Sequence, residues 1–115
     1  MPRKEDLIRL GHMLEAARAA CEYVGSKTKE DFFKDPQCQD AVLRRIEIVG
    51  EAAGKLSVEC QTELAYIPWK KIINMRNRLI HAYYDINLET VWSTVKDDLP
   101  PLIGFLEEVF EKAKY

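Results

Sequence analysis

The chain has few residues from which a covalent or metal-held framework could be built. It contains three cysteines, an odd number, and two histidines, His12 and His81, that lie far apart. Cys21, Cys38 and Cys60 are equally scattered, and neither residue type shows the close spacing of a metal site or a disulfide network. The sequence therefore predicts no metal, no cofactor, and a reducing, cytoplasmic setting.

Long apolar runs are also missing. The chain begins with the charged stretch Met1-Pro2-Arg3-Lys4-Glu5-Asp6, no apolar signal segment follows it, and no stretch is long enough to span a bilayer. With 115 residues, 47% of them hydrophobic and 31% charged, the composition is that of one globular domain with a substantial core. We therefore expect a single domain over residues 1–115 and no association with a membrane.

No stretch alternates between apolar and polar residues as a half-buried strand would. Apolar residues instead recur every three or four positions, which is typical of helices with one buried face. A first helix is expected over Glu5–Val24, ended by Gly25, and Thr28 is a candidate cap for a short second helix. A third begins after the cap Asp35, with Pro36 at its first position. Their core-facing stripes are Leu7, Leu10, Leu14, Ala17, Cys21 and Val24, and Val42, Ile46, Val49, Ala53 and Leu56.

The C-terminal part predicts further helices. Ser57 is a candidate cap for a short helix, Pro68 opens the next, and Asp85 or Asn87 caps the last, after a brief turn at 85–87. The stripe of the last helix continues through Pro100-Pro101, which predicts one helix kinked there, although a break into two helices is the alternative. The fold class is an all-α, up-and-down bundle of four to five helices.

The charge distribution is uneven although the net charge is only −2. Residues 64–84 contain no acidic residue but include Lys70, Lys71, Arg76 and Arg78, so this segment carries +4 and the rest of the chain −6. A local basic strip on an acidic body suits a specific phosphate site better than a broad nucleic-acid footprint. A solvated helix face is the alternative interpretation.

The same segment gathers unusual chemistry in a stretch predicted to be helical. Arg76, Asn77, His81 and Tyr83 fall within eight residues. Arginine offers a permanent charge and a planar fork for phosphate oxygens, and histidine can exchange a proton near neutral pH. On a helix, Tyr83 would lie about 20° from Arg76, whereas Asn77 and His81 would lie about 100–140° round. One chain could aim Arg76 and His81 at a cleft from its two rims, and a dimer could bring two copies of each into one groove.

The spacing Arg-x4-His-x-Tyr, preceded by Pro68-Trp69, resembles the HEPN ribonucleases and, within them, the HepT-like toxins of prokaryotic toxin–antitoxin modules. Further elements of the resemblance stand in the same order and cover most of the chain. They are Asp31-Phe32, Asp40-Ala41-Val42, Ile48-Val49-Gly50-Glu51-Ala52, Ile67-Pro68-Trp69, Arg76-Asn77 and Val91-Trp92. The resemblance implies the same up-and-down bundle and a homodimer, with a dimer of dimers left open.

The resemblance implies an endoribonuclease toxin that cleaves RNA without a metal. Arg76 would hold the scissile phosphate, His81 would act as general base or acid, and Asn77 would bind a phosphate oxygen or orient His81. Arg78 and Lys70 would steer or bind phosphates. Glu51, in the Gly-Glu-Ala element, is expected to be a buried structural carboxylate.

The resemblance also implies regulation through Tyr83. A cognate minimal nucleotidyltransferase antitoxin can transfer AMP to the equivalent tyrosine of HepT-like toxins. On the predicted helix, an anionic adduct on Tyr83 would fill the groove and occupy Arg76. Whether the partner acts by modification, by binding or by both is open from the sequence, and Tyr84 is expected only to pack.

Each candidate residue also has a structural interpretation. Arg76 could pair with Glu51 or Glu47 inside the bundle, His81 could satisfy a carbonyl at a helix end, and Asn77 could be a structural hydrogen-bonding residue. Trp69 and Trp92 are expected in the core, and His12 is not expected to be a ligand. A different class of function follows from these readings: a non-catalytic helical partner of a nucleotidyltransferase, such as its substrate-binding subunit, or a bundle that only dimerises.

Overall fold

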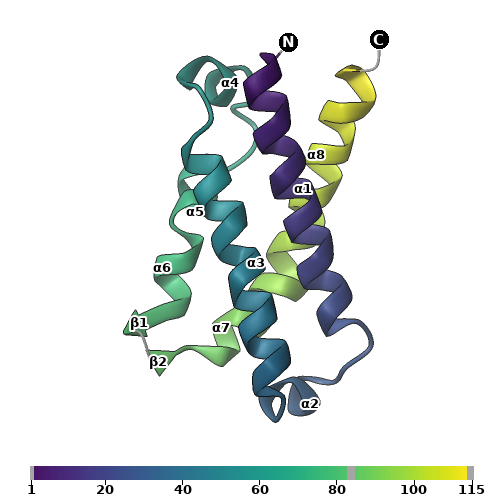
Figure 1. Ribbon diagram of the computed structural model, residues 1–115, viewed down its shortest axis with the longest axis vertical. Helices are drawn as coiled ribbons and strands as arrows, with labels where there is room; N and C mark the ends of the chain where they lie inside the picture. Colours follow the sequence, from purple (N-terminus) through teal and green to yellow (C-terminus); the bar gives the residue numbers. More distant parts are fainter. Residues whose placement is uncertain (1, 83–84, 114–115) are drawn as a thin grey trace.

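The chain folds as an elongated helical bundle. The computed structural model describes residues 2–82 and 85–113, and at positions 81 and 82 it describes only the backbone. The molecule measures 44 × 28 × 19 Å, with the long helices running roughly parallel to its longest axis (Figure 1). The prediction of an all-α bundle with a long, kinked C-terminal helix is confirmed. None of the helices in the described part is both long and apolar enough to span a bilayer.

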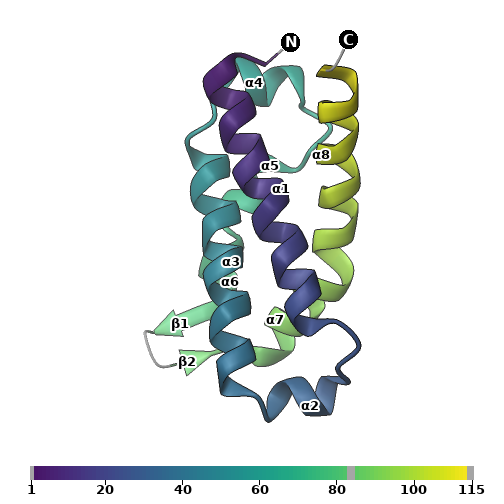
Figure 2. The ribbon, with the colours of Figure 1, turned by 45° about the vertical axis from the view of Figure 1, so that its right-hand side comes forward.

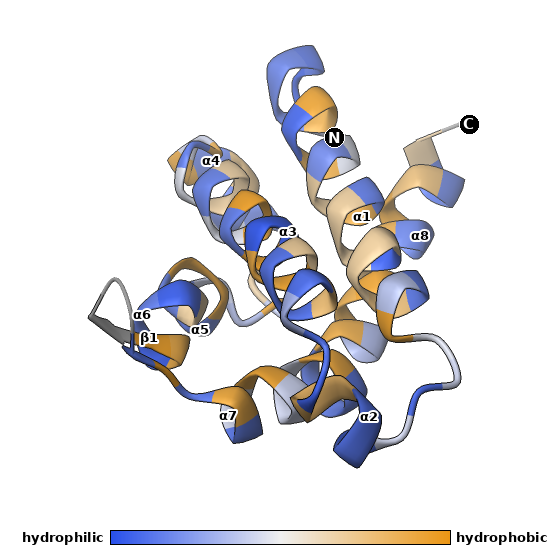
Figure 3. Cartoon of the chain, turned by 60° about the horizontal axis from the view of Figure 1, so that its bottom comes forward, coloured by the Kyte–Doolittle hydropathy of each residue, from blue (hydrophilic) through white to orange (hydrophobic). Residues whose placement is uncertain are grey.

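Helices α1 (Lys4–Val24) and α3 (Pro36–Gly54) form the centre of the bundle and pack along most of their length (Figures 1 and 2). Their buried residues follow the predicted stripes, with Leu10 and Ala17 of α1 and Val42 and Ile46 of α3 completely buried. Hydrophilic and hydrophobic bands occur together along both helices in Figure 3, as expected for helices with one buried face.

The predicted end of α1 and the predicted starts of the next two helices are found where the sequence placed them. Gly25 ends α1 with a φ of 51°, a conformation that glycine adopts without steric cost. The Thr28 hydroxyl accepts from Asp31 N at 3.1 Å and caps α2 (Lys29–Phe33). Asp35 Oδ1 accepts from Cys38 N at 3.1 Å and caps α3. Short polar side chains at these positions satisfy backbone N–H groups that the helix itself cannot bond.

A buried carboxylate joins α1 to the start of α4 (Val58–Glu63). Ser57 caps α4 by accepting from Cys60 N, and it donates both its backbone N–H and its hydroxyl to Asp6, at 2.9 and 2.7 Å. Asp6 is only 2% exposed. Burial acts to raise the pKa of Asp6, but the Ser57 hydrogen bonds and the charges of Arg3 and Arg9 bring it below its ordinary value.

The C-terminal helical segment is continuous but irregular. It comprises α7 (Leu88–Ser93), the π-helical turn η1 (Thr94–Asp98) and α8 (Leu99–Ala113), which packs on α1 (Figure 2). Asn87, one of the two predicted caps, accepts from Thr90 N at 3.1 Å. Pro100 and Pro101 lack the N–H groups that would bond to carbonyls in η1, so the irregular turn lies just before the prolines.

The predicted helix from Pro68 through Tyr84 is wrong in its second half. The structure has α5 (Trp69–Ile73) and α6 (Met75–Leu79), then β1 (Ile80–Ala82) paired antiparallel with β2 (Asp85–Ile86). The predicted turn at 85–87 is therefore partly strand. Ile80 is extended, at φ −120° and ψ 114°, and Asn87 N donates to Leu79 O at 2.8 Å, which closes the hairpin at its base.

Candidate active site

The apolar side chains of residues 69–79, which we call the basic segment, hold that segment on the bundle. Trp69, Ile72, Met75 and Leu79 are buried and recur at helical spacing through α5 and α6, so both helices present one face to the core. Trp69 is fixed further, because its indole Nε1 donates to Leu64 O at 3.0 Å. Trp69 is thus a core residue, as expected. The polar side chains between these anchors are left on the outer surface.

Helix α5 approaches α3 closely at a glycine. A Cβ placed on Gly50 would lie 3.4 Å from the carbonyl oxygens of both Ile72 and Ile73. The backbone of α5 therefore rests directly on α3 at this point, which fixes the position of the basic segment relative to the bundle.

The candidate residues of α5 and α6 are open to solvent. Lys70, Arg76, Asn77 and Arg78 are all exposed. The Arg76 Nε lies 3.9 Å from Glu47 Oε2 of α3, and the Arg76 side chain is 49% exposed. Pairing with Glu47 was one of the two structural alternatives for Arg76, but a pair this exposed leaves the guanidinium free to bind a phosphate.

Arg78 and Lys71 lie toward a different flank of the segment. Both approach Asp98 of η1, Lys71 at 3.5 Å and Arg78 at 4.0 Å. Asp98 belongs to the acidic pair Asp97-Asp98, which does not by itself indicate a partner for the basic segment. Arg76 and Arg78 are thus oriented by carboxylates on opposite sides of α6, Glu47 on α3 and Asp98 on η1.

His81 follows Arg76 along the chain but not on the same helix. Its backbone belongs to β1, where the register between β1 and β2 is irregular between Ile80 and Ala82. The helical angle predicted between Arg76 and His81 is therefore wrong, because the helix ends at Leu79. The His81 side chain and the whole of Tyr83 and Tyr84 lie outside the described residues, so the roles assigned to His81 and Tyr83 remain predictions.

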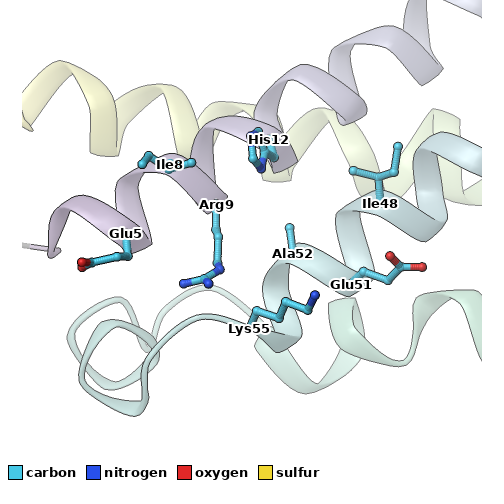
Figure 4. Close-up of a pocket in the computed structure, with 8 residues that line it drawn as sticks. All are labelled: Glu5, Ile8, Arg9, His12, Ile48, Glu51, Ala52 and Lys55. Carbon is cyan, nitrogen blue, oxygen red and sulfur yellow. The ribbon is translucent and has the colours of Figure 1, made fainter.

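Glu51 differs from its expected environment. It is exposed rather than buried, and Arg76 pairs with Glu47, one helical turn earlier. Glu51 lines a depression of about 410 Å³ between α1 and α3, together with Arg9, His12 and Lys55 (Figure 4). Cations and carboxylates alternate there, so this depression has no strong preference for an anion.

A second depression, of about 890 Å³, adjoins the basic segment. Its walls include Val58 of α4, Pro68, Trp69 and Lys70 at the start of α5, and Arg78 of α6. It was not foreseen, because its walls come from segments that are separated in sequence. No cluster of three metal-ligating side chains occurs among the described residues.

Comparison with known proteins identifies the class of protein that carries this fold and basic segment. Residues 13–109 match the profile of the family described as ribonuclease HepT-like. The chain is 36% identical over 105 residues to a candidate RNase of Caldanaerobacter subterraneus, covering 91% of this chain and 94% of that protein. It is 36% identical over 100 residues to the probable ribonuclease HepT of Thermococcus cleftensis, covering 87% and 91%.

A longer relative shares the same region. The chain is 41% identical over 110 residues to a Methanocaldococcus jannaschii protein named as a gamma-glutamylcyclotransferase and candidate RNase, covering 96% of this chain and 50% of that protein. The chain thus spans about half the length of this relative. No solved structure matches the present chain significantly. The chain belongs to the HepT-like ribonuclease family.

Proposed function

We propose that this protein is a metal-independent endoribonuclease that acts as the toxin of a toxin–antitoxin module. The observation that supports this most directly is the position of Arg76: solvent-exposed, and on a helix that leads within one residue into the strand of His81. Membership of the HepT-like family, whose relatives are named as ribonucleases, supports the same activity. The three unpaired cysteines, Cys21, Cys38 and Cys60, fit a reducing cytoplasm.

The proposed reaction is transfer of the RNA phosphate to the neighbouring 2′-hydroxyl. The 2′-oxygen forms a bond to phosphorus while the bond to the 5′-oxygen breaks, which leaves a 2′,3′-cyclic phosphate and a 5′-hydroxyl. One proton leaves the 2′-oxygen and one reaches the 5′-oxygen, and His81 carries out one of these transfers. Arg76 binds the phosphate and offsets the charge that builds on it, and Asn77, beside Arg76 on the exposed face of α6, binds a phosphate oxygen or orients His81.

The direct test is cleavage of mixed RNA in excess EDTA by the parent protein and by Arg76→Ala and His81→Ala. Arg18→Ala and His12→Ala are matched controls, because both residues are exposed on α1, whereas α6 packs on α3, and Arg18 is as exposed as Arg76, at 49%. We expect cleavage by the parent and the controls, with cyclic phosphate ends, and none by the two site variants. Equal cleavage by all five proteins would contradict the assignment of this site.

A homodimer would place two Arg76 and two His81 side chains in one groove. Mixing the inactive Arg76→Ala and His81→Ala chains tests this, because a mixed dimer contains one intact copy of each residue. We expect part of the activity to return after the two variants are unfolded and refolded together. If activity does not return although light scattering shows a dimer, each site is contained within one chain.

The proposed control is transfer of AMP to Tyr83 by a cognate minimal nucleotidyltransferase. Incubation with that partner and ATP should add the mass of one AMP and abolish cleavage, and Tyr83→Phe should prevent both effects. Tyr66→Phe is the matched control, because Tyr66 is 53% exposed on the surface of the bundle. Inhibition of Tyr83→Phe without a change of mass would show that the partner acts by binding alone.

A non-catalytic partner of a nucleotidyltransferase is the second candidate function. It is favoured by the pairing of Arg76 with Glu47, which a purely structural arginine would also make. Under this function, RNA would not be cleaved by any variant, and the nucleotidyltransferase would bind the parent and Arg76→Ala equally well.

A further inference from the structure

The depression between α4 and α5 is lined by apolar and by cationic side chains, which we call its floor and its rim. The floor consists of Val58, Ile67, Pro68 and Trp69, of which Trp69 is only 7% exposed and Val58 is 76% exposed. Because these apolar residues line one depression together, a flat, weakly polar group could be buried against them.

The rim is cationic. Lys70, Lys71 and Arg78 line the depression, and no acidic side chain is among its described lining residues. Lys71 and Arg78 are also drawn toward Asp98, whereas Lys70 makes no ion pair with a residue that the structure describes. The α1–α3 depression is different, because Glu5 and Glu51 stand beside its cations. The charge of the α4–α5 depression therefore complements an anionic occupant.

The polar side chains that line this depression could bind a larger group than a single phosphate. Lys70, Asn74 and Arg78 are spaced four residues apart and all line the depression, so they form one edge of it along α5 and α6. Thr62, from α4, lines it as well and is exposed. The hydroxyl and the amide can bond the edge of a nucleobase, while the two cations at the ends of the row bind phosphates.

We propose that this depression binds one unpaired base of an RNA strand, with the phosphates on either side of that base held by Lys70 and Arg78. The proposal rests on the ribonuclease function proposed above and adds a binding subsite for its substrate. Arg78 lies two residues from Arg76 on α6, and the two side chains point to opposite sides of the helix, so the strand crosses α6 between this subsite and the scissile phosphate. Single-stranded RNA is generally bound by a cationic groove that follows the phosphates and by side chains, most often aromatic ones, on which the bases pack.

The test separates RNA binding from RNA cleavage. Binding of a short fluorescent single-stranded RNA is measured with variants that also carry His81→Ala, so that the RNA is not cleaved. KM and kcat are measured with the same variants in which His81 is intact. Val58→Asp should weaken RNA binding about tenfold and raise KM while kcat changes little, because the base loses an apolar contact and the new carboxylate repels the flanking phosphates. Ile8→Asp is the matched control, because Ile8 is 51% exposed in the other depression and should leave KM unchanged.

Two further experiments test whether the depression binds a base or only the phosphates. An RNA of the same length with abasic nucleotides should bind about tenfold more weakly than the intact strand. Lys70→Glu should weaken binding of both RNAs, because it changes a phosphate contact. Equal binding of abasic and intact RNA, or tighter binding of an acidic peptide than of RNA, would overturn the base site.

The outcomes for the two proposals are distinguishable. If the parent cleaves RNA and Val58→Asp matches it in KM and in RNA binding, the ribonuclease function stands and the subsite is refuted. If no protein cleaves RNA but Val58→Asp and the abasic strand both lose affinity, the subsite stands and the ribonuclease function is refuted. Thermal unfolding of each variant shows that the exposed substitutions leave the fold intact.

Discussion

The Arg76 guanidinium lies 3.9 Å from the Glu47 carboxylate, and both side chains are partly open to solvent. Exposed pairs of this kind contribute about 1 kcal/mol or less to stability. We therefore predict that Arg76→Ala lowers RNA cleavage by about 100-fold or more, as the loss of one charge-stabilising donor does, while the free energy of unfolding changes little. Cleavage rates and urea denaturation of the same preparation test this directly.

Glu47→Gln provides the control for this prediction. It removes the charge that holds Arg76 but leaves the guanidinium in place, so most of the cleavage activity should remain. If Glu47→Gln reduces cleavage as strongly as Arg76→Ala does, then Glu47 is needed to position Arg76 for the reaction.

Asp6 gives a prediction on the pH dependence of stability. Burial acts to raise its pKa, but the Ser57 hydrogen bonds, with Arg3 and Arg9, hold the folded-state pKa below the ordinary value of 3.8. A carboxyl with a depressed folded-state pKa contributes stability that is complete above its unfolded pKa and is lost as the pH falls through the folded one. We predict that stability falls as the pH drops below about 4.

The measurement is urea denaturation at a series of pH values for the parent and Asp6→Asn. The variant should be less stable by about 1–3 kcal/mol at neutral pH, because it weakens two buried hydrogen bonds. The free energy of unfolding of the variant should also fall less steeply below pH 4 than that of the parent. Identical pH profiles for the two proteins would show that other carboxyls cause the acid sensitivity.

Most of the bundle can be predicted from the sequence, because helix caps and apolar stripes depend only on residues a few positions apart. Caps such as Thr28, Asp35 and Asn87 act through a single hydrogen bond to a backbone N–H three residues on. The stripes of α1 and α3 have helical spacing, so their buried faces follow from the sequence.

The hairpin and its surroundings could not be predicted in this way. Ile80–Ala82 is too short for alternation to identify a strand, and its partner Asp85–Ile86 is shorter still. The strand exists because of pairing across the turn and because Asn87 N bonds to Leu79 O, which are contacts made only after folding. For the same reason, the position of His81 relative to Arg76 and the partner of Arg78, Asp98, were not available from the sequence.

The contact between Gly50 and α5 gives a third prediction. A Cβ at position 50 would already lie 3.4 Å from two carbonyl oxygens, so a larger side chain must push α5 away from α3. We predict that Gly50→Leu destabilises the fold by about 1–3 kcal/mol, as overpacking of a well-filled core does. It should also weaken RNA binding by displacing Lys70 and Arg78, which thermal unfolding and RNA titration would measure.

Gly104→Leu is the matched control for this change. A Cβ at position 104 has no neighbouring atom within 4 Å, and the residue lies inside helix α8, so leucine should be tolerated and could add up to about 1 kcal/mol through helix propensity. A larger loss of stability for Gly104→Leu than for Gly50→Leu would contradict the close approach of α5 to α3 at Gly50.

The cysteines give a fourth prediction. Burial raises the pKa of Cys21, Cys38 and Cys60, and that of Cys60 to about 11, with Asp6 and Glu63 adding to the effect. Since the thiolate is the reactive form, alkylation by iodoacetamide at pH 8 should be slow in the folded protein and fast in urea. Intact mass over time measures the rate and peptide mapping locates the modified cysteine, so rapid alkylation of Cys60 in native buffer would show that its site opens.

The short hairpin after α6 has a consequence for how this fold diversifies. Only two residues separate β1 from β2, and Asn87 N donates to Leu79 O at the base of the hairpin. Lengthening such a connection costs little entropy, about 0.6 kcal/mol for each doubling of its length, and disturbs none of the helix contacts below it. The stretch that holds His81 is therefore a point at which insertions could change the substrates of this bundle without unfolding it.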